Sequence, residues 1–419
     1  MVAMPRNGTR TCLLLLIVLT AVFFFPLLTG HTFSTIAGHQ TAVYPWRAFP
    51  NPYQDYPQSD QADLSYPWQI FISRTLRAGE FPFWNPHSFG GQSFFANGSS
   101  AVLYPPRLIA SLLLPPSWVH DALAVLHVLL AGFFMFRLLR EYGSGAAGAL
   151  LSAVAWMFGS YTLAWLHLEV VAPVFPGLPL GVWAVHVACR TGSWARLALA
   201  ATVLGLLLTS GHLPFMGLTI AVPIAYGIAL LGRRCVMTAQ ERRWTVVIES
   251  GARALVLALA PFALAAVVLL PTYFEIQLSQ RQLWPYDAVH TSIRVAPEVL
   301  TYLFWPPPLP ISERRMHEMA FSGLATVFLA FVGAAHLRPG VVFACVLAGV
   351  SLLLALDTAV LRLAYFVLPV FSIFRPLGRL LYLLNFAVAV LGGLGLDNVL
   401  RRDAPRTAAA SGLRAAARE

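Results

Sequence analysis

The chain has 419 residues, of which 58% are hydrophobic and 11% are charged, and its mean hydropathy is +0.69. This composition excludes a soluble globular protein and predicts an all-α polytopic membrane protein. The net charge of +10 does not indicate a nucleic-acid partner. The basic residues stand singly or in pairs at the ends of apolar runs, where they mark the cytoplasmic side and touch lipid head groups.

Apolar runs divide the chain into membrane spans. A helix needs about 20 apolar residues to cross the hydrocarbon core, and by this measure we expect about ten transmembrane helices. The first run follows Arg6 and Arg10 and is longer than the apolar part of a signal peptide, which favours an uncleaved first helix. The piece 361–374 is shorter and contains Pro369, so we expect a re-entrant or interfacial helix there. The ten expected spans lie near residues 11–29, 119–139, 145–165, 169–189, 194–210, 213–231, 252–271, 319–336, 340–356 and 380–400.

The charges in the short loops predict the orientation. Arginines fall on alternate turns, and the positive-inside rule assigns those turns and both termini to the cytoplasm. We therefore expect a transmembrane domain over residues 1–403, with a large first extracytoplasmic loop at 30–118 and a second outer loop at 272–318. The Ala/Arg-rich segment 404–419 is expected to be a disordered cytoplasmic tail.

The first outer loop holds the densest group of chemically active side chains. Asp55, Asp60 and Asp63 lie close together and precede the segment Tyr66-Pro67-Trp68. A carboxylate at the outer mouth of a helix bundle can act as general base toward a sugar hydroxyl. Asp60 is the leading candidate, followed by Asp63 and Asp55, and the alternative is that all three are ordinary solvated loop acids.

An amphipathic helix is expected over residues 68–78, with its apolar side resting on the membrane surface. Arg74 and Arg77 on this helix are interpreted first as lipid-phosphate contacts, and second as contacts to the phosphate of a lipid-linked donor. Tryptophans at the outer interface are interpreted mainly as an aromatic belt, with a minority stacking on sugar rings.

Two histidines fall in outer turns between spans. His167 and Glu169 form an HxE pair, and His212 lies in a Gly-His turn. Each histidine has three interpretations, which are a structural role, a substrate contact as phosphate donor or acid–base group, and a metal ligand. The spacing brings too few ligands together to require a metal.

Short motifs recur in order along nearly the whole chain, and the block in the first outer loop is the most specific of them. Through these motifs the sequence resembles the YfhO family of bacterial membrane proteins, which are placed among the GT-C glycosyltransferases. The motifs are Asp60 six residues before Tyr66-Pro67-Trp68, then Leu76 to Pro86, Phe89-Gly90-Gly91, Ala96-Asn97, Tyr104-Pro105-Pro106, His167, Gly211-His212-Leu213-Pro214, Pro271-Thr272, Ser279-Gln280-Arg281, Phe374 to Arg379 and Gly393-Leu394-Gly395-Leu396-Asp397.

The resemblance implies a GT-C-like bundle that transfers a sugar from a polyprenyl-phosphate donor to an envelope glycan or glycolipid outside the cytoplasmic membrane. Asp60 takes the role of catalytic base, although Asp63 stands where an uncharged residue is expected, so the base can lie three positions later. Family members are often longer than this chain. The substrate-binding residues expected on this basis are Tyr66, Trp68, Trp84, Asn85, His167, His212, Arg281, Arg375 and Arg379.

Two other classes of function stay open. One is a transporter or flippase for a lipid-linked sugar, although such proteins carry ionisable groups at mid-membrane, whereas here the acids gather at the outer mouth. The other is a non-catalytic protein of envelope assembly. No cofactor is required by the sequence, and a divalent metal is compatible with it. The expected partners are the lipid-linked sugar, its acceptor and membrane lipid, with no nucleic acid.

Overall fold

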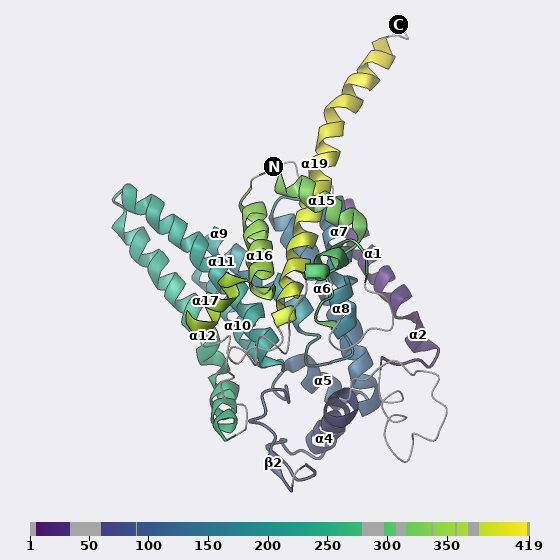
Figure 1. Cartoon of the computed structure of the whole chain (residues 1–419), viewed down its shortest axis with the longest axis vertical. Coiled ribbons are helices and arrows are strands. Elements are labelled where there is room, and N and C mark those ends of the chain that lie inside the picture. The colour runs from purple at the N-terminus through teal and green to yellow at the C-terminus, as the bar shows by residue number, and fades with distance from the viewer. Residues whose placement is uncertain are drawn as a thin grey trace.

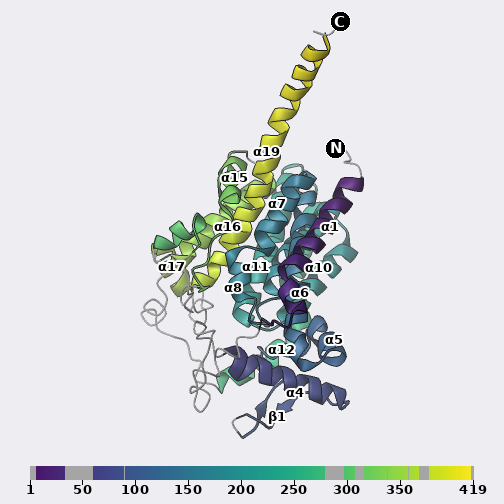
Figure 2. The same ribbon diagram turned by 90° about the vertical axis from the view of Figure 1, so that its right-hand side faces the viewer.

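A computed structural model of the chain describes residues 6–33, 60–88, 90–278, 297–306, 316–336, 338–356, 358–367 and 377–416. These residues are mostly helical (Figure 1), and the strands among them are the short antiparallel pair β1 (Trp84–Asn85) and β2 (Gln92–Ser93). The structure has two parts, a helix bundle and a smaller module at one end of it. The first helix starts at the opposite end of the bundle, and the last helix projects beyond the bundle from that same end (Figures 1 and 2).

The bundle is built from long apolar helices that are separated by short turns. Glycine and proline end several of them, as at Gly192, where a left-handed residue with φ of 64° caps a helix. The bundle elements are α1 (Arg6–Phe23), α2 (Phe25–Leu28), α6 (Pro116–Glu141), α7 (Ala146–Met157), α8 (Ser160–Trp165), α9 (Val174–Thr191), α10 (Trp194–Leu208), α11 (Leu213–Gln240), α12 (Trp244–Gln277), η3 (Pro297–Leu303), α15 (Leu324–Ala334), α16 (Pro339–Ala355), α17 (Ala359–Val367), η4 (Leu377–Leu380) and α19 (Leu381–Ala416).

The last helix, α19, forms the centre of the bundle and packs against α7, α15 and α16. Glycines allow this close packing, since a Cβ at Gly395 would lie 1.9 Å from the carbonyl oxygen of Leu329. Asp397 also accepts a hydrogen bond from the backbone N–H of Gly145, 2.7 Å away, at the start of α7. Past Asp403, α19 continues as a helix to Ala416, into the segment for which the sequence predicts disorder. Alanine has the highest helix propensity, which accounts for the continuation.

Membrane-spanning character is present in several of these helices. Five stretches are long and apolar enough to cross a membrane, and four shorter apolar helices accompany them in the part of the chain that the structure describes. Each of the ten ranges expected from the sequence coincides with a helix or a pair of helices, but a total of ten crossings stays a prediction. The five long stretches are Pro116–Glu141, Ala146–Trp165, Leu213–Gln240, Trp244–Gln277 and Gly378–Arg401.

The smaller module is called the outer module below, because the sequence predicts that its residues lie in the first outer loop. It comprises η2 (Gln61–Ser65), α4 (Tyr66–Arg77), the β1–β2 hairpin and α5 (Pro105–Leu113). It has a small core of its own, in which Trp68 and Ile72 of α4 meet Phe94 and Val102. The helix expected over 68–78 is therefore present, but the apolar side that we expected on the membrane surface packs inside the module. An amphipathic pattern identifies the buried side of a helix without saying whether protein or lipid covers it.

Candidate functional site

The turn between α8 and α9, residues 166–173, is buried along its whole length and joins two polar clusters. Its neighbour in space is the turn before α11, where the backbone N–H of His212 donates to the carbonyl oxygen of Val170 at 3.2 Å. Gly211 makes this approach feasible, because it has a φ of 128° and a Cβ there would lie 2.9 Å from the Val170 Cβ. The two histidine-bearing turns are thus bonded to each other.

The first cluster surrounds two aromatic rings and is called the aromatic site below. Trp165 and Phe215 meet edge to face, with ring centroids 5.2 Å apart. His317 lies 4.7 Å and His167 6.3 Å from the Trp165 ring, measured between centroids. The indole N–H of Trp165 donates to the carbonyl oxygen of Met316 at 3.3 Å, which holds the segment of His317 against the turn.

The Phe215 ring gathers the other members of the aromatic site. The guanidinium carbon of Arg379 lies 5.2 Å from the ring centroid, in cation–π geometry. The imidazole of His212 lies 5.1 Å away, and its Nδ1 accepts the backbone N–H of Phe215 at the start of α11. Tyr161 and Tyr382 complete the ring of aromatic side chains at 6.3 and 5.8 Å.

Electrostatically, the aromatic site pairs neutral imidazoles with one arginine. Burial lowers the pKa of His167 to about 4, although the carbonyl oxygen of Ala164, which accepts the Nδ1–H at 2.8 Å, acts in the opposite direction. Burial, and then the positive charge of Arg379, lower the pKa of His317 to about 3. Both imidazoles are therefore neutral at pH 7 and can donate or accept hydrogen bonds, beside a guanidinium that carries the positive charge.

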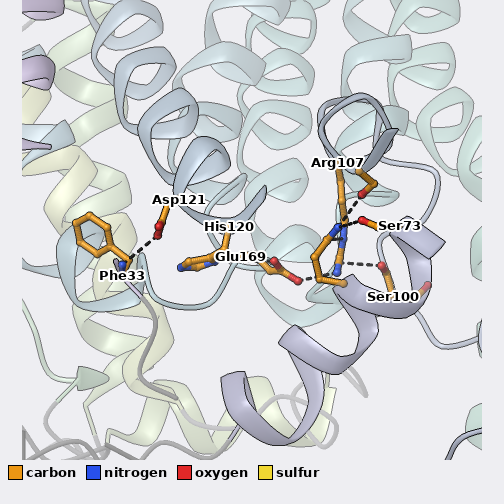
Figure 3. A network of polar contacts seen from close by, with 9 residues as sticks. Phe33, Ser73, Ser100, Arg107, His120, Asp121 and Glu169 are labelled. Atoms are coloured by element: carbon orange, nitrogen blue, oxygen red, sulfur yellow. Dashed lines mark hydrogen bonds and ion pairs between the residues drawn. The ribbon is translucent and has the colours of Figure 1, made fainter. Parts of the chain in front are cut away.

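The second cluster is a buried ionic network, called the clamp below and drawn in Figure 3. Arg107 of α5 is 2% exposed, and its Nη2 lies 2.6 Å from Oε1 of Glu169. Its Nη1 donates to the carbonyl oxygen of Ser100 at 2.9 Å, and its Nε donates to Oε1 of Gln69 at 3.1 Å. Nδ1 of His120 lies 3.9 Å from Oε2 of Glu169 on the other side. Burial is the main influence on the pKa of Arg107 and lowers it, while Glu169 raises it.

The predicted acids lie in the outer module or outside the described residues. Asp60 and Asp63 are exposed at the beginning of η2, which continues directly into α4. Asp55 lies outside the described residues, and so do Arg281 and Arg375. Their predicted roles stay predictions.

The predicted aromatic contacts of the outer module differ in exposure. Trp84 is 57% exposed on β1, and Tyr66 is half-buried at the start of α4. Trp68 is buried edge to face against Phe94, with centroids 5.8 Å apart. Asn85 is also buried, and its Oδ1 accepts the backbone N–H of His87 in a turn. Trp68 and Asn85 therefore have internal partners, whereas more than half of the Trp84 side chain is exposed to solvent.

Three of the predicted substrate contacts come together in the bundle. His167, His212 and Arg379 all surround the Trp165–Phe215 pair, although they come from the turn 166–173, the turn before α11 and the helix η4. His167 and Glu169, expected as an HxE pair, face different clusters, since Glu169 turns to Arg107. Sequence reasoning missed Gln69, Arg107, His120, Tyr161, His317 and Tyr382.

One of these missed residues carried a signal in the sequence. Arg107 directly follows the Tyr104-Pro105-Pro106 motif, within the predicted outer loop that also contains Arg47, Arg74 and Arg77, against the positive-inside trend. Its place beside that motif is the signal that could have singled it out. Among the described residues, no three His, Cys, Asp or Glu side chains form a group that could hold a metal ion.

In comparison with known proteins, no family model matches this sequence and no curated protein matches it.

Proposed function

We propose that this chain is a membrane glycosyltransferase of the GT-C type, which transfers a sugar from a polyprenyl-phosphate donor to an envelope glycan or glycolipid. The observation that carries the proposal is the convergence of Arg379, His167 and His212 on the Trp165–Phe215 pair. Arginine is suited to phosphate, imidazoles bond to hydroxyl or phosphate oxygens, and aromatic faces stack on sugar rings. These are the groups that a phosphosugar requires.

The reaction is an inverting displacement without a covalent enzyme intermediate. A base takes the proton of the acceptor hydroxyl while the lipid phosphate leaves from the sugar carbon. We assign the base to Asp60, with Asp63 and Asp55 as alternatives, and the stabilisation of the leaving phosphate to Arg379. A cation aimed at the charge that develops on the leaving group is among the largest contributions to catalysis.

We further propose about ten crossings of the cytoplasmic membrane, with both termini in the cytoplasm and the outer module outside. The arrangement of charge supports this orientation. Arg140 and Arg190 lie at the ends of α6 and α9, and Arg401 lies on α19 near Gly143, at the end of the bundle that carries the termini (Figure 2). The positive-inside rule favours that end for the cytoplasm.

The test is transfer of labelled sugar from a polyprenyl-phosphate donor by purified protein in lipid. We expect transfer by the wild type and a loss of at least about a hundredfold in Asp60→Asn, the low end for a general base. The matched control is Glu80→Gln, since Glu80 is another exposed carboxylate of the outer module. Transfer at the wild-type rate in each of Asp60→Asn, Asp63→Asn and Asp55→Asn would contradict the assignment of the base.

The same assay separates the two rival functions. A transporter or flippase would move the labelled donor between leaflets without transferring its sugar. An assembly protein would bind donor or polymer and do neither. Absence of transfer by the wild type, with donor bound, would therefore replace the transferase by a binding or transport function.

A further inference from the structure

We propose that Arg107 is a positioning residue, which fixes the helix beginning at Asp60 against the buried turn that carries His167. The inference rests on the proposed transferase function, because it gives Arg107 a role in presenting these two side chains. Figure 3 shows the arrangement, in which Arg107 of the outer module reaches toward Glu169 of the bundle. Arg107 itself is assigned no contact with substrate.

Arg107 joins three segments of the chain. Its three hydrogen-bonding nitrogens reach Gln69 on α4, the carbonyl of Ser100 in the loop before α5, and Glu169 in the turn 166–173. Gln69 in turn donates to the hydroxyls of Ser73 and Ser111, which locks its amide in place. One guanidinium thus connects both helices of the module to the bundle.

Gln69 and Glu169, the side chains at the two ends of this connection, each stand close in sequence to a predicted site residue. Gln69 belongs to the continuous helical run η2–α4, whose first residues follow Asp60. Glu169 stands two positions after His167, which borders the aromatic site. A shift at Arg107 is therefore transmitted to the predicted base on one side and to a predicted substrate contact on the other.

The connection between module and bundle includes an ion pair, that of Arg107 and Glu169. Taking a guanidinium and a carboxylate out of water is costly, and apolar side chains of similar volume often stabilise a fold equally well. What the planar guanidinium adds is direction, because its donors point along fixed lines in one plane. An ion pair in which both side chains are 3% exposed is therefore better explained by geometric precision than by stability.

The experiment uses full-length protein in lipid with the double substitution Arg107→Met/Glu169→Met, which removes both charges and leaves neither partner unpaired. A matched control is Arg253→Met/Glu249→Met, which removes another ion pair of 2.6 Å, within α12. Two quantities are measured, which are the kcat and donor KM of sugar transfer, and amide hydrogen exchange over residues 60–77. Arg107→Lys is measured beside them, since it keeps the charge and loses the planar fork.

We expect the clamp variant to remain folded and to exchange faster over residues 60–77 than wild type. Its kcat should fall about a hundredfold, as for a misplacement of about 1 Å, with donor KM within about threefold of wild type. Arg107→Lys should have a kcat and an exchange rate between those of the clamp variant and the wild type. The α12 control should match the wild type in both measurements.

Unchanged exchange over residues 60–77 and unchanged kcat in the clamp variant would overturn the proposal, since the pair would then be replaceable packing. An equal loss in the α12 control would overturn it as well. If the wild type transfers no sugar, the proposed function fails, and the exchange measurement still decides whether Arg107 fixes the module.

Discussion

The two polar clusters beside the turn 166–173 solve the problem of buried charge in different ways. In the clamp, a carboxylate, an amide oxygen and a backbone carbonyl receive the donors of Arg107. In the aromatic site, the guanidinium of Arg379 lies over the ring of Phe215 and imidazoles surround the Trp165–Phe215 pair. The clamp therefore fixes the direction of its cation by hydrogen bonds to oxygen atoms, whereas the aromatic site holds its cation against the face of a buried ring. On the function proposed above, the first cluster positions and the second binds the donor.

The largest expected effect is on the stability of the clamp. Arg107→Met alone leaves the carboxylate of Glu169 buried without its partner, which should lower the free energy of unfolding by about 3–5 kcal/mol. The double variant Arg107→Met/Glu169→Met should recover most of that loss. Unfolding of the single and double variants in the same detergent measures the difference. Equal stability of the two would mean that Glu169 is not held by Arg107.

The corresponding change in the aromatic site should act on ligand binding. Arg379→Gln removes the charged hydrogen-bond donor that we propose for the lipid phosphate. Such a bond is worth about 1.5–3 kcal/mol, so donor affinity should fall about 10–100-fold. The control is Arg196→Gln, because Arg196 is exposed at the start of α10, near the end that we propose to be cytoplasmic. Titration with labelled polyprenyl-phosphate sugar measures both. Equal affinities would remove Arg379 from the site.

Acid should destabilise the aromatic site through its histidines. His167 and His317 have pKa values of about 4 and about 3 in the folded protein, below the value of about 6.5 in the unfolded chain. The unfolded state therefore binds more protons, and stability that is complete above pH 6.5 is lost as pH falls toward 4 and 3. At pH 5 each histidine should cost about 2 kcal/mol. Unfolding at pH 7.5 and pH 5, in wild type and His317→Asn, measures this, and an identical pH dependence in both would contradict it.

The last prediction concerns two buried tyrosine hydroxyls, and the loss of one of them, that of Tyr382, is the smallest expected effect. Tyr382→Phe removes a hydrogen bond to Thr219, whose hydroxyl still donates to the carbonyl oxygen of Phe215, and should cost about 1 kcal/mol. Tyr104→Phe removes the partner of His127, 2.8 Å away, and should cost up to about 3 kcal/mol, because a buried ring nitrogen loses its bond. Thermal unfolding ranks the two, and the reverse order would contradict the hydrogen-bond assignment.

The helices could be predicted from the sequence because their signals are local. Apolar runs of sufficient length, with proline or glycine near their ends, located helices such as α6 and α11 to within a few residues at their starts. The expected helix over 68–78 was found as α4 for the same reason. The apolar side of α4 is covered by Phe94 and Val102. These residues lie outside the helix, so the apolar pattern of α4 alone does not predict this contact.

The candidate site was predictable in part. His167, His212 and Arg379 were singled out by their unusual places between apolar runs and by the resemblance, but no pattern in the sequence indicated that they share one pair of rings. The clamp was missed because Arg107 and Glu169 are 62 positions apart and meet only through the docking of α5 on the bundle. Pairings of this kind depend on tertiary packing, which the spacing of residues in the sequence does not predict.

The most direct test of the central claim is to locate the donor on the protein. A polyprenyl-phosphate sugar with a photoreactive group near the phosphate is bound to wild-type protein in lipid, irradiated, and mapped by peptide mass spectrometry. The account predicts labelling at residues 160–173, 212–219 and 377–386, with loss of that labelling in Arg379→Gln. Labelling confined to the opposite end of the bundle, or unchanged by Arg379→Gln, would contradict it.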